Sequence, residues 1–121
     1  MKRNKILLAS LVFTFIFFSS NAKAESIIMI VSAEQWAIPR HGERIINMSE
    51  IKTIIQAWQK NPKQLIEISY PGGESGELWL TELKDWFIAL GISSANIKAV
   101  AGSGSKDIIK LTVVTAEGIL E

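Results

Sequence analysis

The sequence predicts an α/β fold of the α+β type, a two-layer sandwich in which two helices cover one face of a mixed four-stranded sheet. Short β-rich runs alternate with two longer segments whose apolar residues repeat at helical spacing. The expected order is β-α-β-α-β-β, and Gly, Pro, Asn and Ser residues separate the elements. Without its first 24 of 121 residues, the chain is long enough for one modest core.

The N-terminus has the three parts of a secretory signal peptide. Lys2, Arg3 and Lys5 are basic, residues 6–18 carry no charge and are mostly apolar, and residues 22–24 (Ala-Lys-Ala) fit an A-x-A cleavage pattern. The apolar run is shorter than the about 20 residues that a membrane span needs. We therefore expect cleavage after Ala24 and one exported, periplasmic domain over residues 25–121. An uncleaved membrane anchor is the alternative.

The composition argues against several classes of function. Four of the 13 Lys and Arg residues, and none of the 12 Asp and Glu residues, precede residue 25, so the exported domain is mildly acidic. A nucleic-acid-binding domain needs clustered basic residues, which the domain lacks. The absence of Cys excludes a disulfide framework and a lipid-attached Cys. With His41 as the single His, we expect no metal and no other cofactor, and we expect His41 to be a solvated loop residue.

The first half of the domain begins with a strand and a mixed segment. Residues 26–33 (SIIMIVSA) are rich in β-branched residues and predict the first strand. In residues 34–46, Pro39 and Gly42 interrupt any long element. We expect an edge loop there, in which residues 43–46 (ERII) form a short extra strand.

The first helix is expected over residues 49–60. Its apolar residues follow the i, i+3, i+4, i+7 spacing of one helical face. Ser49 is the expected N-cap, and Asn61-Pro62 ends the helix, because a residue before Pro is disfavoured in the α region. The apolar face consists of Ile51, Ile54, Ile55 and Trp58.

The second half supplies a strand, a helix and two strands. Residues 64–69 alternate, with Ile66 and Ile68 on one side of a half-buried strand. Residues 77–90 predict a well-buried helix, with Gly91 as the C′ glycine and Ile92 in the contact that accompanies such a cap. Its expected buried residues are Leu78, Trp79, Leu80, Leu83, Trp86, Phe87, Ile88 and Leu90. Strands over residues 96–101 and 107–114 follow, joined by a turn at residues 102–105.

The glycine-rich loop at residues 70–76 (Y-P-G-G-E-S-G) is either a strand-to-helix turn or a ligand cradle. Glycine lets a ligand approach a helix N-terminus, where backbone N–H groups favour anions. However, the loop lacks the G-K-[ST] ending of a P-loop and the G-x-S-x-G pattern of a nucleophile elbow. Glu74 and Glu77 would repel phosphate, and they suit a turn or a cationic ligand.

Catalytic groups are poorly represented, and we expect no enzyme. A Ser-His-Asp arrangement would have to use His41, and the carboxylates of the loop and of residues 77–90, including Glu82 and Asp85, are better explained as a solvated charged face. Core packing explains three Trp residues, Trp58, Trp79 and Trp86. Trp36 lies outside any apolar pattern and is the expected exposed contact.

Several stretches resemble a known family. The run LIEIS leads into Y-P-G-G-E-S-G, then residues 80–85 (LTELKD) and 89–92 (ALGI). This is similar to the strand, G-H-T-D-x-x-G loop and N-x-x-L-S-x-x-R-A helix ending in G-[IV] of OmpA-like, peptidoglycan-binding domains. The resemblance covers about residues 26–114. It implies the β-α-β-α-β-β fold and a ligand site at the loop.

The resemblance implies ligand residues, with departures. In the family an acid and an Arg grip the diaminopimelate of the peptidoglycan stem peptide. Here residues 70–73 replace G-H-T-D, so Glu74 would have to supply the acid. The family's Asn falls at Glu77. Lys84 stands at the Arg position, but a Lys ammonium cannot make the bidentate hydrogen bonds of an Arg guanidinium. The closing N-R-R-V-x-[IV] pattern is reduced to D-I-I-K-L at residues 107–111. The implied ligand-binding residues are Gly72, Gly73, Glu74, Glu77 and Lys84.

The stretch Y-P-G-G-E-x-G-E-L-W-x-x-E-L-x-D-W-x-x-A-L-G-I also looks like small exported proteins of integrative conjugative elements, which accompany type IV secretion machinery. The sequence therefore predicts a non-enzymatic periplasmic accessory protein on a degenerate OmpA-like scaffold. Its partners would be envelope or secretion-apparatus proteins, contacted through Trp36 and the loop that begins at Tyr70. The alternatives are a peptidoglycan-binding anchor that uses the loop and Lys84, and an envelope enzyme.

Overall fold

The structure is a computed structural model that describes residues 27–115. The expected signal segment, residues 1–24, lies outside the described residues. Within the described part of the chain, no helix combines the length and the apolar character that crossing a membrane requires.

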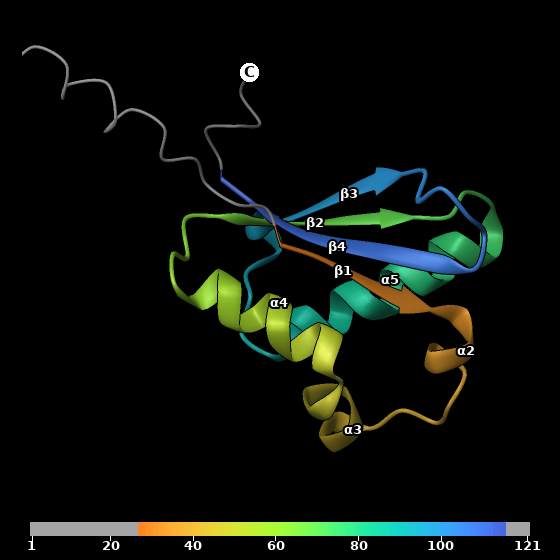
Figure 1. The fold of residues 1–121 in the computed structure, drawn as a ribbon, viewed down its shortest axis with the longest axis horizontal. Helices are drawn as coiled ribbons and strands as arrows, with labels where there is room; N and C mark the ends of the chain where they lie inside the picture. The colour runs from red at the N-terminus through yellow and green to blue at the C-terminus, as the bar shows by residue number, and fades with distance from the viewer. Residues whose placement is uncertain (1–26, 116–121) are drawn as a thin grey trace, which may run out of the picture.

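Within residues 27–115, four strands form one mixed sheet in the order β1-β4-β2-β3 (Figure 1). The central strand β4 runs antiparallel to both of its neighbours, whereas β2 and β3 are parallel. The parallel pair requires a crossover connection, which one of the helices supplies. The strands are β1 (Ile27–Ser32), β2 (Leu65–Tyr70), β3 (Ile97–Ala101) and β4 (Ile108–Val114).

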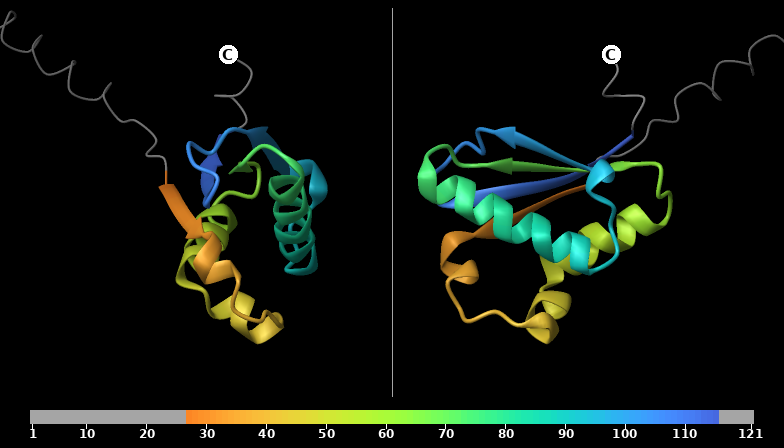
Figure 2. Two further views of the ribbon diagram at one scale, coloured as in Figure 1. Left: turned by 90° about the vertical axis from the view of Figure 1, so that its right-hand side faces the viewer. Right: turned by 180° about the vertical axis from the view of Figure 1, so that it is seen from behind.

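The helices of the described part of the chain lie on one face of the sheet (Figure 2). The two long helices, α4 (Ser49–Gln59) and α5 (Glu74–Ala89), pack against the strands, and α5 lies in the crossover from β2 to β3. The short elements are α2 (Ala33–Trp36), α3 (Gly42–Asn47) and the 3₁₀-helix η2 (Ser94–Asn96). The two-layer α+β sandwich predicted from the sequence is confirmed.

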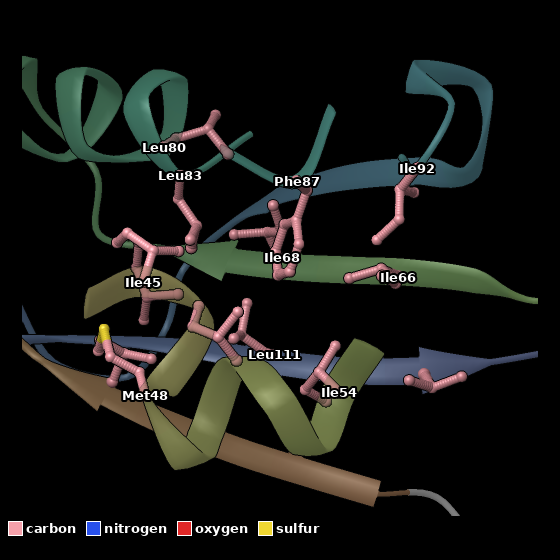
Figure 3. Packing of buried hydrophobic residues seen from close by; sticks show 14 of the residues in the cluster. Ile45, Met48, Ile54, Ile66, Ile68, Leu80, Leu83, Phe87, Ile92 and Leu111 are labelled. Carbon is pink, nitrogen blue, oxygen red and sulfur yellow. The ribbon is translucent and has the colours of Figure 1, made fainter. Parts of the chain in front are cut away.

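The core lies between the sheet and the two long helices (Figure 3). Ile66 and Ile68 of β2 are fully buried, as the alternation of that strand predicts. They belong to one cluster with Leu83 and Phe87 of α5 and with Ile54 of α4. The predicted packing of three Trp residues is also confirmed, since Trp58, Trp79 and Trp86 are partly buried against this cluster.

The C-terminus of α5 is the predicted glycine cap. Gly91 has φ 106°, in the left-handed region that favours Gly. Its N–H donates to the Ile88 carbonyl at 3.0 Å, and the Ile92 N–H donates to the Phe87 carbonyl at 3.1 Å. These two bonds make a Schellman motif, and the burial of Ile92 completes it.

One predicted strand is wrong. Residues 43–46 lie in helix α3, not in a short extra strand. The β-branched pair Ile45-Ile46 favours a strand, but Ile45 and Met48 are spaced for one side of a helix, and both are buried. The imidazole Nδ1 of His41 accepts a hydrogen bond from the Arg44 N–H at 3.4 Å and caps the helix.

Two helix details also differ from the prediction. Ser49 is the first residue of α4, and its predicted role as N-cap belongs to Met48. Helix α5 begins three residues early, at Glu74, and its buried residues are Gly76, Leu80, Leu83 and Phe87. Leu78 and Ile88 lie off this face and are exposed by 66% and 42%, contrary to the expected burial.

Candidate functional site

The glycine-rich loop at residues 70–76 is a tight strand-to-helix turn. Gly73 has φ 89° and precedes α5 directly, so its conformation favours Gly. Gly76 lies in the first turn of α5 against the preceding loop, where an added Cβ would be 1.8 Å from the Pro71 carbonyl oxygen. Pro71 is itself buried. Backbone geometry and close packing therefore account for Gly73 and Gly76 without a ligand.

Gly72 occupies a different position, at the rim of a hollow. The hollow has a volume of about 220 Å³ and is lined by Pro71, Gly72 and residues 102–106. It lies where the parallel strands β2 and β3 end, because the Gly102 N–H donates to the Tyr70 carbonyl at 2.8 Å and holds the two loops together. Of the described residues that line it, Lys106 alone is charged.

Residues 102–106, which also line the hollow, form a turn with hydrogen bonds of its own. Ser103 is 1% exposed, and its hydroxyl donates to the Ser105 carbonyl at 2.7 Å. The Ser105 hydroxyl accepts from the Asp107 N–H at 3.2 Å. The turn was predicted from its Gly and Ser residues, but its place beside the 70–76 loop depends on the parallel pairing of β2 and β3. The charged group that the hollow offers to a small ligand is the ammonium of Lys106.

The structure brings only some of the expected ligand residues together. Gly73, Glu74 and Glu77 are at the N-terminal end of α5, next to Gly72 in the chain. Lys84 lies ten residues after Glu74 in the same helix, about 15 Å further along the helix axis at 1.5 Å per residue. The two residues of the expected ionic grip are therefore not side by side.

Tyr70 and Glu77 are in contact across the turn. The Tyr70 hydroxyl donates to the Glu77 carboxylate at 3.2 Å. Desolvation, followed by the charge of Glu77 and this hydrogen bond, raises the pKa of Tyr70 above its usual value. The protonated phenol is the hydrogen-bond donor in this contact. This contact ties the end of β2 to the first turn of α5.

Trp36 was expected to be an exposed contact, and this expectation is wrong. The residue is only 6% exposed. Helix α2 places its ring beside that of Trp79, with ring centroids 6.4 Å apart. Its indole N–H donates to the Glu82 carboxylate at 3.4 Å. The apolar pattern missed this burial because the surface that covers Trp36 comes from a distant part of the chain.

Glu82 is held by Arg40, although its side chain remains 40% exposed. The guanidinium Nε and Nη2 donate to the two carboxylate oxygens at 2.7 and 2.8 Å, and the guanidinium lies 4.6 Å from the centroid of the Trp36 ring. Arg40 Nη1 also donates to the Trp36 carbonyl. The hydrogen bonds from Arg40, above all, hold the pKa of Glu82 below its usual value.

The ion pair connects the segment before α3 to helix α5. Arg40 and Glu82 are 42 positions apart, so no local pattern predicts their pairing. One signal does exist, because Glu82 falls between Trp79 and Trp86 on the same face of α5. A carboxylate between two aromatic residues of a packed face needs a partner. The geometry, with both groups partly exposed and paired, is that of a structural clamp.

The remaining expectations concern His41 and metals. His41 is exposed, as predicted, although it also caps α3. Within residues 27–115, no three His, Cys, Asp or Glu side chains lie close enough together to hold a metal ion. Neither a family model nor a curated protein matches the chain at a significant level.

Proposed function

We propose that the chain is a non-enzymatic accessory protein of the cell envelope. It is exported to the periplasm, has a degenerate OmpA-like scaffold, and serves a conjugative or type IV secretion apparatus through protein–protein contacts. The signal-peptide pattern of residues 1–24 supports export. The β-α-β-α-β-β order of the long elements agrees with the family resemblance.

The observation that carries this proposal is the separation of Glu74 from Lys84. Diaminopimelate bears an ammonium and a carboxylate on the same carbon atom, so an acid and a base that grip both groups have to bring their charged ends close together. Here the two residues are about 15 Å apart along the axis of α5. They also point in different directions, because ten residues at 100° each leave them about 80° apart around the helix. We therefore infer that this domain works through protein–protein contacts rather than by binding diaminopimelate.

Deletion of the gene in its natural host tests the proposal. If the protein serves a conjugative apparatus, the deletion lowers the transfer frequency of the resident element, and the full chain supplied in trans restores it. The matched control is a chain that lacks residues 2–24, which keeps the same folded domain but has lost the export pattern. This control should not restore transfer. Unchanged transfer after deletion, or full restoration by the control, contradicts the proposal.

Peptidoglycan binding is the second candidate, and the hollow beside Gly72 favours it. The hollow lies at the loop where the resemblance implies the ligand site, and it contains Lys106. A stem-peptide carboxylate would then meet Lys106, while Glu74 would take the ammonium. Loss of sacculus binding in Lys106→Ala or Glu74→Ala, with retention in Lys84→Ala, would establish this candidate. Absence of binding by the unmodified protein would eliminate this candidate, and equal binding by all three variants would eliminate the hollow and Glu74 as its site.

A further inference from the structure

Strand β1 leaves one edge of the sheet open. The order β1-β4-β2-β3 places β1 and β3 at the two edges (Figure 1). Among residues 27–115, no segment pairs with the outer edge of β1. An open edge presents unpaired backbone N–H and C=O groups, to which another strand can be added.

The side chains of β1 do not protect this edge. Its six residues, Ile27–Ser32, include no charge and no Pro. Ile28 and Ile30 are exposed by 55% and 50% and alternate with the buried Val31. They therefore lie on the opposite face of the sheet from Val31, the face without helices. Natural edge strands are usually protected by charged residues, and the opposite edge strand β3 has the exposed Lys98. An uncharged edge with two exposed Ile side chains is typical of an interface.

The hydrogen-bond register shows which backbone groups are free. The Ala33 N–H donates to the Asp107 carbonyl at 2.8 Å, one step beyond the Ser32–Ile108 pair. In an antiparallel ladder every second residue bonds to the neighbouring strand. Val31 and Met29 consequently point their backbone groups toward β4. The N–H and C=O groups of Ile28 and Ile30 point away from the sheet.

We propose that β1 pairs with β1 of a second copy of this chain, antiparallel, about a twofold axis at Met29. Ile28 of each copy then lies opposite Ile30 of the other. The free N–H and C=O groups of both residues are all used, and the two sheets become one continuous sheet. The Ile side chains of both copies form one apolar cluster on the helix-free face. The pairing ends at Ser32, whose N–H is already bonded to the Gln35 side chain at 3.1 Å.

The register suits a second copy, because Ile28 and Ile30, whose backbone groups are free, lie symmetrically about Met29, and charge does not oppose this pairing. In strand β4, Thr112 is the neighbour of Ile28, and Lys110 is the neighbour of Ile30. Across the proposed dimer, a row of neighbouring side chains therefore consists of Lys110 and Ile30 of one copy, followed by Ile28 and Thr112 of the other. No two like charges are adjacent in this row. A strand that is uncharged along its length pairs with itself without repulsion. Two paired strands make a small interface, which implies moderate affinity.

The test measures molar mass by sedimentation equilibrium from about 1 μM to about 1 mM, a range that covers moderate and weak association. The protein is purified from cells that express the full chain with a C-terminal tag, so that N-terminal processing is left to the cell. We expect a monomer–dimer equilibrium. A monomer at every concentration overturns the proposal.

Two double variants test the register. Ile28→Glu with Ile30→Glu places like charges opposite each other, and we expect the dissociation constant to rise by about tenfold or more. Ile28→Lys with Ile30→Glu places opposite charges together in the same register and should retain the dimer. Leu78→Glu, which changes an exposed apolar residue of α5, is the matched control and should also retain it. A dimer that persists in the first variant, or is lost in the second, overturns the proposal.

Disulfide trapping gives a readout that does not depend on surface charge. The chain has no Cys, so a single introduced Cys reacts only with its copy. Met29→Cys lies on the proposed axis, where the two Cα atoms of a non-hydrogen-bonded pair are about 4.5 Å apart, within disulfide range. Under mild oxidation it should give a covalent dimer, whereas Ile28→Cys, displaced from the axis, should give much less. Equal trapping of both variants, or of neither, contradicts the axis at Met29.

Discussion

Gly76→Ala tests whether the glycine-rich loop is a packing turn. In an ordinary helix interior, Ala is more favourable than Gly by about 1 kcal/mol. At Gly76 the new Cβ would lie 1.8 Å from the Pro71 carbonyl oxygen and 2.6 Å from its carbonyl carbon, whereas real Cβ contacts essentially never fall below 3.0 Å. Because both clashing atoms are backbone, either the loop or the first turn of α5 has to move by more than 1 Å.

This displacement is costly because both sides are fixed. Pro71 is buried directly after β2, and Leu80, one turn beyond Gly76, belongs to the core. Overpacking of this kind costs about 3 kcal/mol, which more than offsets the gain in helix propensity. For a domain of this size, a loss of about 3 kcal/mol lowers the melting temperature by about 12–24 °C.

Thermal unfolding followed by circular dichroism measures the effect, with Gly72→Ala as the matched control. A Cβ at Gly72 would meet no atom within 4 Å, and Gly72 does not have a positive φ. The control should therefore melt at or slightly above the temperature of the unmodified protein. A Gly76→Ala variant as stable as the unmodified protein would refute the packing argument, and so would equal destabilisation by both variants.

The remaining predictions concern the ion pair between Arg40 and Glu82 and the residues around it. Glu82→Gln should lower the free energy of unfolding by about 0.5–1 kcal/mol at neutral pH, a modest value because the Glu82 side chain is 40% exposed. Urea denaturation measures this free energy, and an unchanged value would contradict the stabilising role of the ion pair. Because the pKa of Glu82 is lowered in the folded state, its contribution is present above the ordinary value of 4.5 and is lost as the pH falls through the folded pKa. The difference between Glu82→Gln and the unmodified protein should therefore shrink in acid, and a difference that stays constant with pH would show that charge is not its cause. Trp36→Ala should lower the free energy of unfolding, measured by urea denaturation, by about 3 kcal/mol, since the residue is 6% exposed. Leu78→Ala, at an exposed position, should change it by less than about 0.5 kcal/mol. Similar losses in both variants would contradict the burial of Trp36.

Local spacing in the sequence was sufficient to predict the long elements. The i, i+3, i+4, i+7 spacing of α4, the alternation of β2 and the Gly91 cap of α5 each depend on residues within a few positions of one another. Such patterns follow from the geometry of a single helix or strand. They predict the layers of the fold because each long element has one apolar face.

Features that depend on distant residues could not be predicted in this way. The apolar run of β1 gives no alternation, so it does not reveal that Ile28 and Ile30 are exposed while Val31 is buried. Trp36 is buried against α5, more than 40 positions away, and Arg40 pairs with Glu82 of the same helix. The short helix α3 follows the same rule, since burial of Ile45 outweighs its strand propensity.

The candidate site was predictable in its position but not in its composition. The Gly and Pro residues of the 70–76 loop predicted a turn between β2 and α5, and the structure has one there. The hollow, however, needs residues 102–106 as its second wall, and these meet the loop only because β2 and β3 are parallel neighbours. Lys106 therefore lies at the hollow, whereas Lys84, chosen by resemblance, lies further along α5.

The most direct measurement is co-sedimentation of the protein, purified from cells that express the full chain, with intact peptidoglycan sacculi. Free diaminopimelate serves as competitor, and an OmpA-like domain with the complete acid and Arg pair serves as the positive control. Because Glu74 and Lys84 do not lie side by side, we predict no sedimentation that diaminopimelate can displace. Binding that diaminopimelate displaces, and that Glu74→Ala weakens, would contradict the central claim that this scaffold acts without the peptidoglycan grip.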